Sequence, residues 1–326
     1  MDTRGECRFK TVLVTGAAGF AGRYLVRELS GMGHEVACLD AVPADSAAAA
    51  DLPGYRCVDL ADAAAVDSAV AAVRPDAVIH LAAISFLPEA AKNPGLLWAV
   101  NIDGTMHVVE AVLRHCPQSR FVFVSSAQVY GAAAPEPYAT KVAEDHPLLP
   151  LSHYAISKVA GERFVGACAA LRGLDAVIVR PSNHTGPGQS PKFVAISFAS
   201  QIVAASPAPG QSAKMRVGNL DSVRDFSDVR DVVRAYRLVM EKGIGGEVYN
   251  VSSGTMLSMR ELLERMLSMR GVKMEIEKDE ALWRPTDNCA ALSTAKIERD
   301  TGWKPRFSLD ETLRGIFASL AQEGAV

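Results

Sequence analysis

The sequence lacks the cysteine and histidine patterns that mark disulfide frameworks and metal sites. Its six cysteines (7, 38, 57, 116, 168 and 289) lie far apart with no C-x-x-C pair, and its seven histidines show no metal-ligand spacing. Several cysteines fall inside predicted strands or helices, where cysteine behaves as a small hydrophobic residue. We therefore expect reduced cysteines, a cytoplasmic protein and no bound metal.

The chain also lacks an excess of charge of either sign. It has 34 Lys and Arg against 37 Asp and Glu, a net charge of −3, so nothing favours nucleic acid or an anionic membrane as partner. A negatively charged substrate can still bind through local arginines. We find no apolar run long enough to cross a bilayer, and the start, M-D-T-R-G-E-C-R-F-K, lacks the apolar core of a signal peptide.

What the sequence does contain, along its first half, is an alternation of short apolar runs with helical patterns. Strands are predicted at 11–15, 35–40, 55–59, 76–81, 120–125 and 175–180, and helices at 19–30, 62–74, 94–116 and 153–172. Continuous runs rich in β-branched residues, separated by helices, are typical of a parallel sheet that helices cover on both faces. The expected fold is α/β, a Rossmann-type doubly wound parallel sheet.

The character of the chain changes after Pro181. Residues 182–224 hold many Pro, Gly and Ser, and a strand then follows at 247–252, between helices at 228–242 and 258–270. We predict a cofactor-binding domain at 1–181 and a smaller α/β substrate-binding lobe at 182–326, with segments near 225–252 returning to the sheet. Substrate is expected between the two, at the carboxyl ends of the strands.

The stretch T-G-A-A-G-F-A-G (15–22) lies between the first strand and the first helix. Gly16 permits a tight turn, Gly19 lets backbone N–H groups approach a pyrophosphate, and Gly22 allows the helix to pack closely on the sheet. An acidic residue, Asp40, ends the second strand, where it can accept hydrogen bonds from the adenosine ribose. This context predicts a dinucleotide-binding site.

The charges around that site favour NAD(H). Asp40 would repel a 2′-phosphate, and residues 41–55 contain no Arg or Lys to receive one. NADP(H) stays an alternative because Arg23 or Arg56 can lie within reach. Asp59 and Leu60, after the third strand, are interpreted as adenine contacts, and a helix N-cap is the alternative for Asp59.

Two further stretches supply reacting groups: S-S-A-Q-V-Y (125–130) at a strand end and Y-A-I-S-K (154–158) on a helix. Tyr154 and Lys158 are four residues apart and share one helix face. An ammonium near a phenol favours the phenolate and lowers its pKa from about 10, which suits an acid or base in alcohol–ketone chemistry. Ser126 would donate a hydrogen bond to the same substrate oxygen.

Taken together, these motifs resemble the extended short-chain dehydrogenase/reductases that act on nucleotide sugars. The resemblance rests on TGAAGFAG, HLAA (80–83), VNIDGT (100–105), SSAQVYG, YAISK and RPSNHTGPGQ (180–189). It implies that Ser126, Tyr154 and Lys158 are catalytic and that Asn101 supports the active-site helix. It also implies cofactor contacts at Gly16, Gly19, Phe20, Gly22, Asp40, Asp59, Leu60, Leu81, Ala82, Ala83, Asn101, Tyr154 and Lys158. By the same resemblance, a homodimer would form as a four-helix bundle from the helices at 94–116 and 153–172.

The second half of the chain resembles the branch of that family that binds GDP-6-deoxyhexoses. The similar stretches are NHTGPGQSP (183–191), VGNLDSVRDFSDVRD (217–231) and RPTD (284–287). The resemblance implies substrate contacts at Ser85, Gln128, Asn183, Arg224, Arg284 and Asp287, with both arginines on the diphosphate. A local salt bridge to Asp225 is the alternative for Arg224, and a turn position is the alternative for Arg284. His184 is either a sugar contact or a buried structural residue.

Gln128 separates the two activities that share this branch. Dehydratases need a carboxylate near the sugar C5, and the family places a Glu two residues after the hydroxyl of the strand. Here Ala127 and Gln128 follow Ser126, and an amide has no useful basicity. We therefore expect a reductase that converts a GDP-4-keto-6-deoxyhexose into a GDP-6-deoxyhexose of the GDP-rhamnose type. The alternatives are a 4-epimerase with tightly bound NAD, a 4-ketoreductase for a dTDP-, UDP- or CDP-linked sugar, and a cofactor-sensing protein without turnover.

Overall fold

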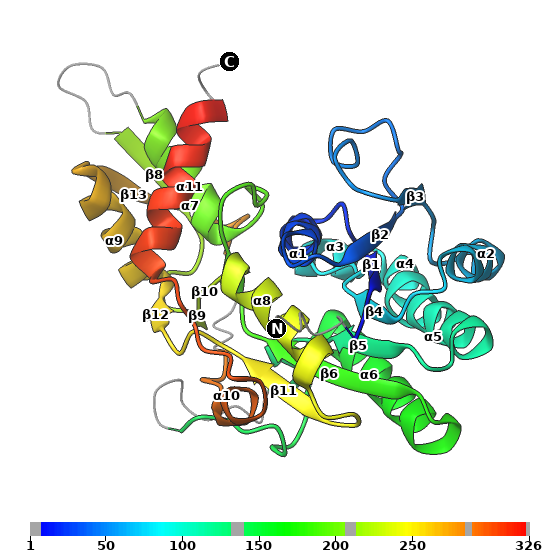
Figure 1. Ribbon diagram of the computed structural model, residues 1–326. Coiled ribbons are helices and arrows are strands. Elements are labelled where there is room, and N and C mark those ends of the chain that lie inside the picture. Colours follow the sequence, from blue (N-terminus) through cyan, green and yellow to red (C-terminus); the bar gives the residue numbers. More distant parts are fainter. Residues whose placement is uncertain (1–7, 132–139, 206–212, 284–288, 324–326) are drawn as a thin grey trace, which may run out of the picture.

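A seven-stranded parallel sheet forms the centre of the molecule (Figure 1). The computed structural model describes residues 8–131, 140–205, 213–283 and 289–323. In the order in which they lie in the sheet, the strands are β11 (Val248–Val251), β6 (Asp175–Pro181), β5 (Arg120–Val124), β4 (Ala77–His80), β1 (Thr11–Thr15), β2 (Glu35–Asp40) and β3 (Tyr55–Cys57). All neighbouring pairs are parallel. The order reverses between β1 and β4, which confirms the Rossmann-type doubly wound fold and marks the point where such sheets bind ligands.

Helices cover both faces of this sheet. One face carries α1 (Phe20–Gly31) and α8 (Val229–Lys242), and the other carries α2 (Ala63–Val73), α5 (Gly104–His115) and α6 (His153–Arg172). Because both faces are buried, β4 and β5 are buried at every position and β1 at all but its first, and their inner residues are apolar instead of alternating.

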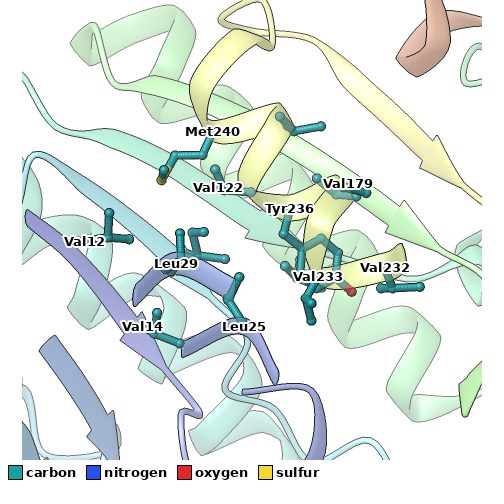
Figure 2. Close-up of a cluster of buried hydrophobic side chains, with 14 of the residues drawn as sticks. Val12, Val14, Leu25, Leu29, Val122, Val179, Val232, Val233, Tyr236 and Met240 are labelled. Carbon is teal, nitrogen blue, oxygen red and sulfur yellow. The ribbon is translucent and has the colours of Figure 1, made fainter. Parts of the chain in front are cut away.

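Figure 2 shows the core on the first of these faces, where α1 and α8 meet the strands. Leu25 and Leu29 of α1 lie over Val12 and Val14 of β1, and Tyr236 of α8 reaches the same layer. The labelled side chains are buried. Each fully buried aliphatic side chain of this size contributes roughly 1.5–3 kcal/mol of hydrophobic stabilisation.

A second group of elements, called the small lobe below, has a core of its own. It comprises α7 (Val194–Ala204), β8 (Ala213–Val217), α9 (Met259–Arg270), β13 (Met274–Lys278) and α11 (Leu309–Glu323). These elements gather at the upper left of Figure 1, away from the large sheet. The Pro-, Gly- and Ser-rich composition of residues 182–224 gave no expectation of a helix there. Nevertheless Val194–Ala204 contains no Pro or Gly, and one side of it is buried.

Short paired strands connect the small lobe to the large sheet. They are β7 (His184–Thr185) with β10 (Ser227–Asp228), and β9 (Val223–Asp225) with β12 (Met256–Ser258). The chain then returns to the large sheet, where β11 pairs with β6 and α10 (Ala295–Thr301) packs nearby. The division of the chain into domains 1–181 and 182–326 stays a prediction.

One helical run, predicted at 94–116, is more apolar than the sequence led us to expect. Residues Pro94–His115 form a continuous helix through α4 (Pro94–Trp98), a π-helical turn (Ala99–Asp103) and α5, shortly after α3 (Leu87–Lys92). By length and composition alone it passes a test for membrane-spanning helices, at a mean hydropathy of 1.2. Here 44% of that window is buried inside the fold, and α5 packs against α2 and α6, as a core helix does.

Candidate active site

The glycine turn lies at the carboxyl end of β1, beside the loop that follows β4. Gly16 has φ +71°, and a Cβ on it would stand 2.8 Å from backbone atoms of Ala82. A Cβ on Gly22 would lie 2.2 Å from the carbonyl oxygen of Gly16. Helix α1 starts after Gly19 without a side-chain cap, so its first N–H groups face the turn. An uncapped helix start beside a turn that admits no side chain fits a dinucleotide pyrophosphate.

Asp40 is held against this turn. Its Oδ2 accepts a hydrogen bond from the Ala18 amide at 2.9 Å, and its Oδ1 accepts one from the Val42 amide at 3.3 Å. Asp59 is exposed, and its Oδ1 accepts from the Ala61 amide at 2.9 Å. The N-cap of α2 is Asp62, so the alternative reading of Asp59 as a helix cap was wrong.

The predicted contacts that follow β4 lie next to the glycine turn. The amides of Leu81 and Ala82 donate to the backbone oxygen and the hydroxyl of Thr15. Ala83 continues this partly buried segment, and Ser85 is exposed just beyond it. Leu60 is buried in the core under α2 and α5.

His80, at the end of β4, is a fully buried structural residue. Its two ring nitrogens lie 2.7 Å from the Thr15 hydroxyl and 3.0 Å from the Thr105 hydroxyl. Burial, reinforced by the Lys158 charge, lowers the pKa of His80 to about 3, so the ring is neutral. It locks β1, β4 and α5 together beneath the site.

Asn101 lies in the π-helical turn and connects three elements. Its Oδ1 accepts from the Ile84 amide at 2.8 Å, and its Nδ2 donates to the Ser157 hydroxyl at 3.0 Å. Ser157 in turn donates to the Tyr154 carbonyl at 2.7 Å. The predicted support of the active-site helix by Asn101 therefore has a direct physical route, through Ser157 to the first turn of α6.

Ser126 and Gln128 stand at the carboxyl end of β5. The Ser126 hydroxyl caps a 3₁₀ turn, Ala127–Val129, by accepting from the Gln128 amide at 3.2 Å. Both side chains are partly exposed, and Ala127 between them is buried. The turn therefore presents a hydroxyl and an amide toward the site.

Tyr154 and Lys158 lie on one face of α6, and both are buried. The Lys158 ammonium is 5.9 Å from the centre of the Tyr154 ring and donates to the Val124 carbonyl at 2.8 Å. A hydrogen bond joins Ser126 and Tyr154. The three residues predicted to be catalytic are thus brought together at the end of β5.

The electrostatics differ from the sequence-based expectation for Tyr154. Burial raises the pKa of Tyr154 to about 12, and its hydrogen bond with Ser126 only partly offsets this. The predicted lowering was wrong for the protein alone, because the loss of solvent outweighs any help from Lys158. Burial also lowers the pKa of Lys158 to about 8, an effect that Glu162 opposes.

Glu162 is a residue that the sequence reading missed. It lies one helical turn beyond Lys158 and forms a buried ion pair with Arg180 of β6, with N–O distances of 2.9 and 2.7 Å. The signal was available, since Tyr154, Lys158 and Glu162 follow each other at spacings of four on one helix face.

Two of the predicted substrate residues, Asn183 and Arg224, lie on the loop after β6 and on β9. The Asn183 amide lies 3.7 Å from the Cys289 sulfur, and its backbone oxygen accepts from Ser227 at 2.9 Å. His184 is partly buried and stacks on Phe20 at the start of α1, with ring centres 6.3 Å apart. Burial lowers the pKa of His184, which keeps the ring neutral.

Arg224 and Asp225 point to different partners. The Arg224 guanidinium donates to the Val223 carbonyl at 3.1 Å. The fully buried Asp225 carboxylate accepts from the hydroxyls of Ser182, Ser227, Ser252 and Ser253. The alternative reading of a local salt bridge between these neighbours therefore does not describe Asp225. Arg284 and Asp287 lie outside the described residues.

Along the described ranges, no three His, Cys, Asp or Glu side chains gather as a metal site would require. Residues 12–252 match the family described as "NAD dependent epimerase/dehydratase family". The chain belongs to this family. It is accordingly an NAD(P)-dependent enzyme, and the family match covers the glycine turn, Asp40, the end of β5 and the Tyr154–Lys158 pair.

Individual relatives extend the match over most of the chain. GDP-6-deoxy-D-mannose reductase of Pseudomonas aeruginosa is 36% identical over 245 residues, 75% of this chain and 80% of the relative. dTDP-glucose 4,6-dehydratase of Streptomyces griseus is 31% identical over 319 residues, 94% of this chain and 93% of the relative. The structure of RMD from Pseudomonas aeruginosa complexed with NADPH superposes with a TM-score of 0.82 at 31% identity, covering 96% of this chain and 99% of that one.

Proposed function

We propose that this chain is a nucleotide-sugar 4-ketoreductase, which reduces the C4 ketone of a GDP-4-keto-6-deoxyhexose to give a GDP-6-deoxyhexose. The broader assignment, an enzyme that modifies nucleotide sugars, follows from its family. The similarity to a GDP-6-deoxy-D-mannose reductase supports the finer one. A similar level of identity to a 4,6-dehydratase means that a site residue has to decide between the two.

Gln128 carries the proposal. Dehydration requires a base near the sugar C5, and this chain has Ala127 and Gln128 on the turn that follows Ser126. An amide donates and accepts hydrogen bonds but does not remove a carbon-bound proton. The site can therefore orient a sugar at this position without starting an elimination.

The three residues at the end of β5 and on α6 fit ketone reduction. NAD(P)H, when bound, supplies the hydride that reaches C4. Tyr154, whose raised pKa keeps the phenol protonated at neutral pH, gives its proton to the C4 oxygen as that oxygen gains charge. Ser126 donates a hydrogen bond to the same oxygen, and the Lys158 ammonium stabilises the tyrosinate that is left behind.

Six residues are proposed to contact the substrate. Ser85 and Gln128 would meet the sugar, Asn183 would hold the sugar nucleotide, and Arg224 would meet the diphosphate. Arg284 and Asp287 complete the proposed set, on the diphosphate and the guanosine ribose. A guanidinium suits phosphate oxygens because its planar N–H groups match them in pairs.

We propose NADH as the preferred reductant. The Asp40 carboxylate faces the glycine turn through the Ala18 amide, where its charge disfavours a 2′-phosphate. Arg23 donates to the Gly188 carbonyl at 3.3 Å, which draws this cation toward the loop after β6. Arg56 on β3 is exposed and keeps NADPH open as an alternative.

The dimer proposed from the family resemblance would form around α6 and the helical run Pro94–His115. Trp98, Met106 and Ile156 on these helices are each more than a third exposed, although they are large and apolar. Covering them in a four-helix bundle would remove this surface from water. Ile156→Lys with Met106→Glu should give a monomer in light scattering, while Met32→Lys, at the more exposed C-cap of α1, should not change the mass.

A coupled assay tests the reaction. A separate 4,6-dehydratase acting on GDP-mannose would generate the 4-keto sugar, and loss of nicotinamide absorbance would be followed after addition of this protein with NADH or NADPH. We expect stoichiometric loss, faster with NADH, and none with Tyr154→Phe. No loss with fresh wild-type protein would refute the GDP-sugar reductase.

The same assay separates the alternatives. A 4-epimerase keeps its NAD bound, so protein that contains NAD and converts UDP- or dTDP-hexoses without net cofactor consumption would favour that reading. Consumption with a dTDP-, UDP- or CDP-linked 4-keto sugar alone would change the nucleotide but keep the chemistry. Any measurable hydride transfer excludes a sensor without turnover.

A further inference from the structure

The end of β5 is joined to α6 at three consecutive residues. Lys158 donates to the carbonyl of Val124, Glu162 accepts from the hydroxyl of Ser125, and the next residue, Ser126, contacts Tyr154. The three α6 side chains lie at successive helical turns on one face. Glu162 is therefore part of the same framework as the proposed catalytic residues, and it carries the only side-chain negative charge among these six.

Arg180 of β6 holds Glu162 in place. Its Nε and one Nη donate to the two carboxylate oxygens, and its other Nη donates to the Tyr130 hydroxyl and to the Glu144 carbonyl, both at 2.9 Å. The side chains of this pair are only 4% and 6% exposed. A bidentate pair with three further polar partners is fixed in position, so the carboxylate stays one turn below Lys158.

We propose that Glu162, clamped by Arg180, is a positioning residue for the reaction: its buried negative charge keeps the Lys158 ammonium protonated, and its bond to Ser125 fixes the turn that carries Ser126. This inference rests on the proposed function, because it assigns a task to Lys158. The pair Glu162 and Arg180 touches neither substrate nor cofactor in this assignment and acts through Lys158 and Ser125.

The charged and titratable groups around Lys158 leave Glu162 as its source of negative charge. Tyr154 of α6 and the neutral His80 of β4 face Lys158 directly. Arg180 of β6 pairs with Glu162, and Tyr236 of α8 interacts with Tyr154. Tyr130 and the segment at Glu144 lie behind Arg180, and the Glu144 carboxylate accepts from the Asn250 amide. An ammonium in so apolar a place loses its proton readily unless a carboxylate opposes this loss.

The opposing tendencies are visible in the lysine itself. Burial lowers the pKa of Lys158 to about 8, and Glu162 acts in the other direction. Removing the carboxylate charge while Arg180 remains would leave a second buried cation near Lys158, and both changes favour the neutral amine. Removing Arg180 instead would leave Glu162 without its clamp and its neutralising charge, which favours the ammonium.

The test is a titration of Lys158 by NMR in protein labelled with ¹³Cε-lysine, with the resonance assigned from Lys158→Met. We expect Glu162→Gln to lower the midpoint by about one pH unit or more, and Arg180→Gln to raise it. Asp175→Asn, which breaks the ion pair to Arg120 at the other end of the same strands, should leave it unchanged. Glu162→Asp keeps the charge and should restore a midpoint close to that of the wild type.

Opposite shifts in the two variants would support the inference. An unchanged midpoint in both, or the same shift with Asp175→Asn, would overturn it. Where Glu162→Gln fails to fold, Arg180→Gln and Glu162→Asp decide by the direction of their shifts. Because the titration needs no substrate, a clear shift in a protein that reduces no 4-keto sugar would sink the proposed function alone. Turnover with unshifted lysine midpoints would sink only the role of Glu162.

Discussion

The two ends of strands β5 and β6 carry the same chemistry in different surroundings. At the amino ends, Arg120 pairs with Asp175 and also donates to the carbonyls of Met240 and Gly243. At the carboxyl ends, Arg180 pairs with Glu162. Both arginines are buried, but Asp175 is 28% exposed and Glu162 only 4%.

The difference in exposure decides how strongly each ion pair acts on its surroundings. The amino-end pair ties β5 and β6 to the end of α8 and is open to water on one side. The carboxyl-end pair is closed off and lies behind Lys158, so its field reaches a proposed catalytic group with little screening. We expect the first pair to affect stability and the second to affect stability and chemistry together.

The largest expected effect is on kcat, when a tyrosine hydroxyl is removed near each end of the strands. Tyr154→Phe should lower kcat by about 10²- to 10⁴-fold, as loss of a general acid does. Tyr249→Phe, which loses hydrogen bonds with Asp300 and Ile244 near the amino end, should keep kcat and lose about 1 kcal/mol of stability. Steady-state rates and urea unfolding of both variants would check this, and equal rates in the two would contradict it.

Replacing the arginine of each ion pair should destabilise the protein by different amounts. Arg180→Met leaves the buried Glu162 carboxylate unpaired and should cost about 3–5 kcal/mol of unfolding free energy. Arg120→Met leaves Asp175, which water can reach, and should cost less, about 1–3 kcal/mol. Urea unfolding of both variants measures the two losses, provided that the dependence of the unfolding free energy on urea is unchanged. A larger loss of unfolding free energy for Arg120→Met than for Arg180→Met would contradict this comparison.

Helix α1 allows a similar comparison along a single element. A Cβ on Gly22, next to the glycine turn, would meet backbone oxygens of Gly16 and Ala17, whereas a Cβ on Gly31 at the far end would meet open space. Gly22→Ala should weaken NAD(P)H binding by an amount corresponding to about 1–3 kcal/mol of strain. Gly31→Ala should bind normally and gain at most about 1 kcal/mol of stability. Fluorescence titration with NADH distinguishes the two, and normal binding by Gly22→Ala would count against the cofactor site.

The pH dependence should be the mildest effect. Lys158 is protonated below its pKa of about 8, so the charged form that reduction needs is lost as pH rises. We expect kcat to be level below that value and to fall about tenfold per pH unit well above it. Asp175→Asn should leave the pH at which kcat begins to fall unchanged. A rate that stays level to pH 10 would exclude Lys158 as the controlling group.

The sequence predicted the sheet well because each buried strand is a continuous apolar run with a helix pattern after it. The strands and helices predicted in the first half end within two residues of those observed, including α6 at 153–172, but α3 (Leu87–Lys92) was missed. The glycine turn and the Tyr154–Lys158 pair were found for the same reason, since their spacing is local. The fold of the small lobe was less accessible, because its strands are short and pair across long stretches of chain.

Two features of the site could not be read from local patterns. The partner of Glu162 lies 18 residues away on a strand, so the ion pair appears only when α6 packs beside β6. The pKa of Tyr154 was expected to fall and instead rises. The spacing of four residues predicts that Lys158 is near, but the burial that outweighs its charge depends on the tertiary packing.

The place of β11 has a consequence for how this protein is made. The last strand of the large sheet and helix α8, which covers one of its faces, both come from beyond residue 228. A nascent chain that has emerged only as far as β6 therefore has an unpaired strand edge and an uncovered apolar face, both of which promote aggregation. The large sheet is complete only after Val251 has been synthesised. We therefore expect fragments that stop near residue 181 to need chaperones or to be degraded.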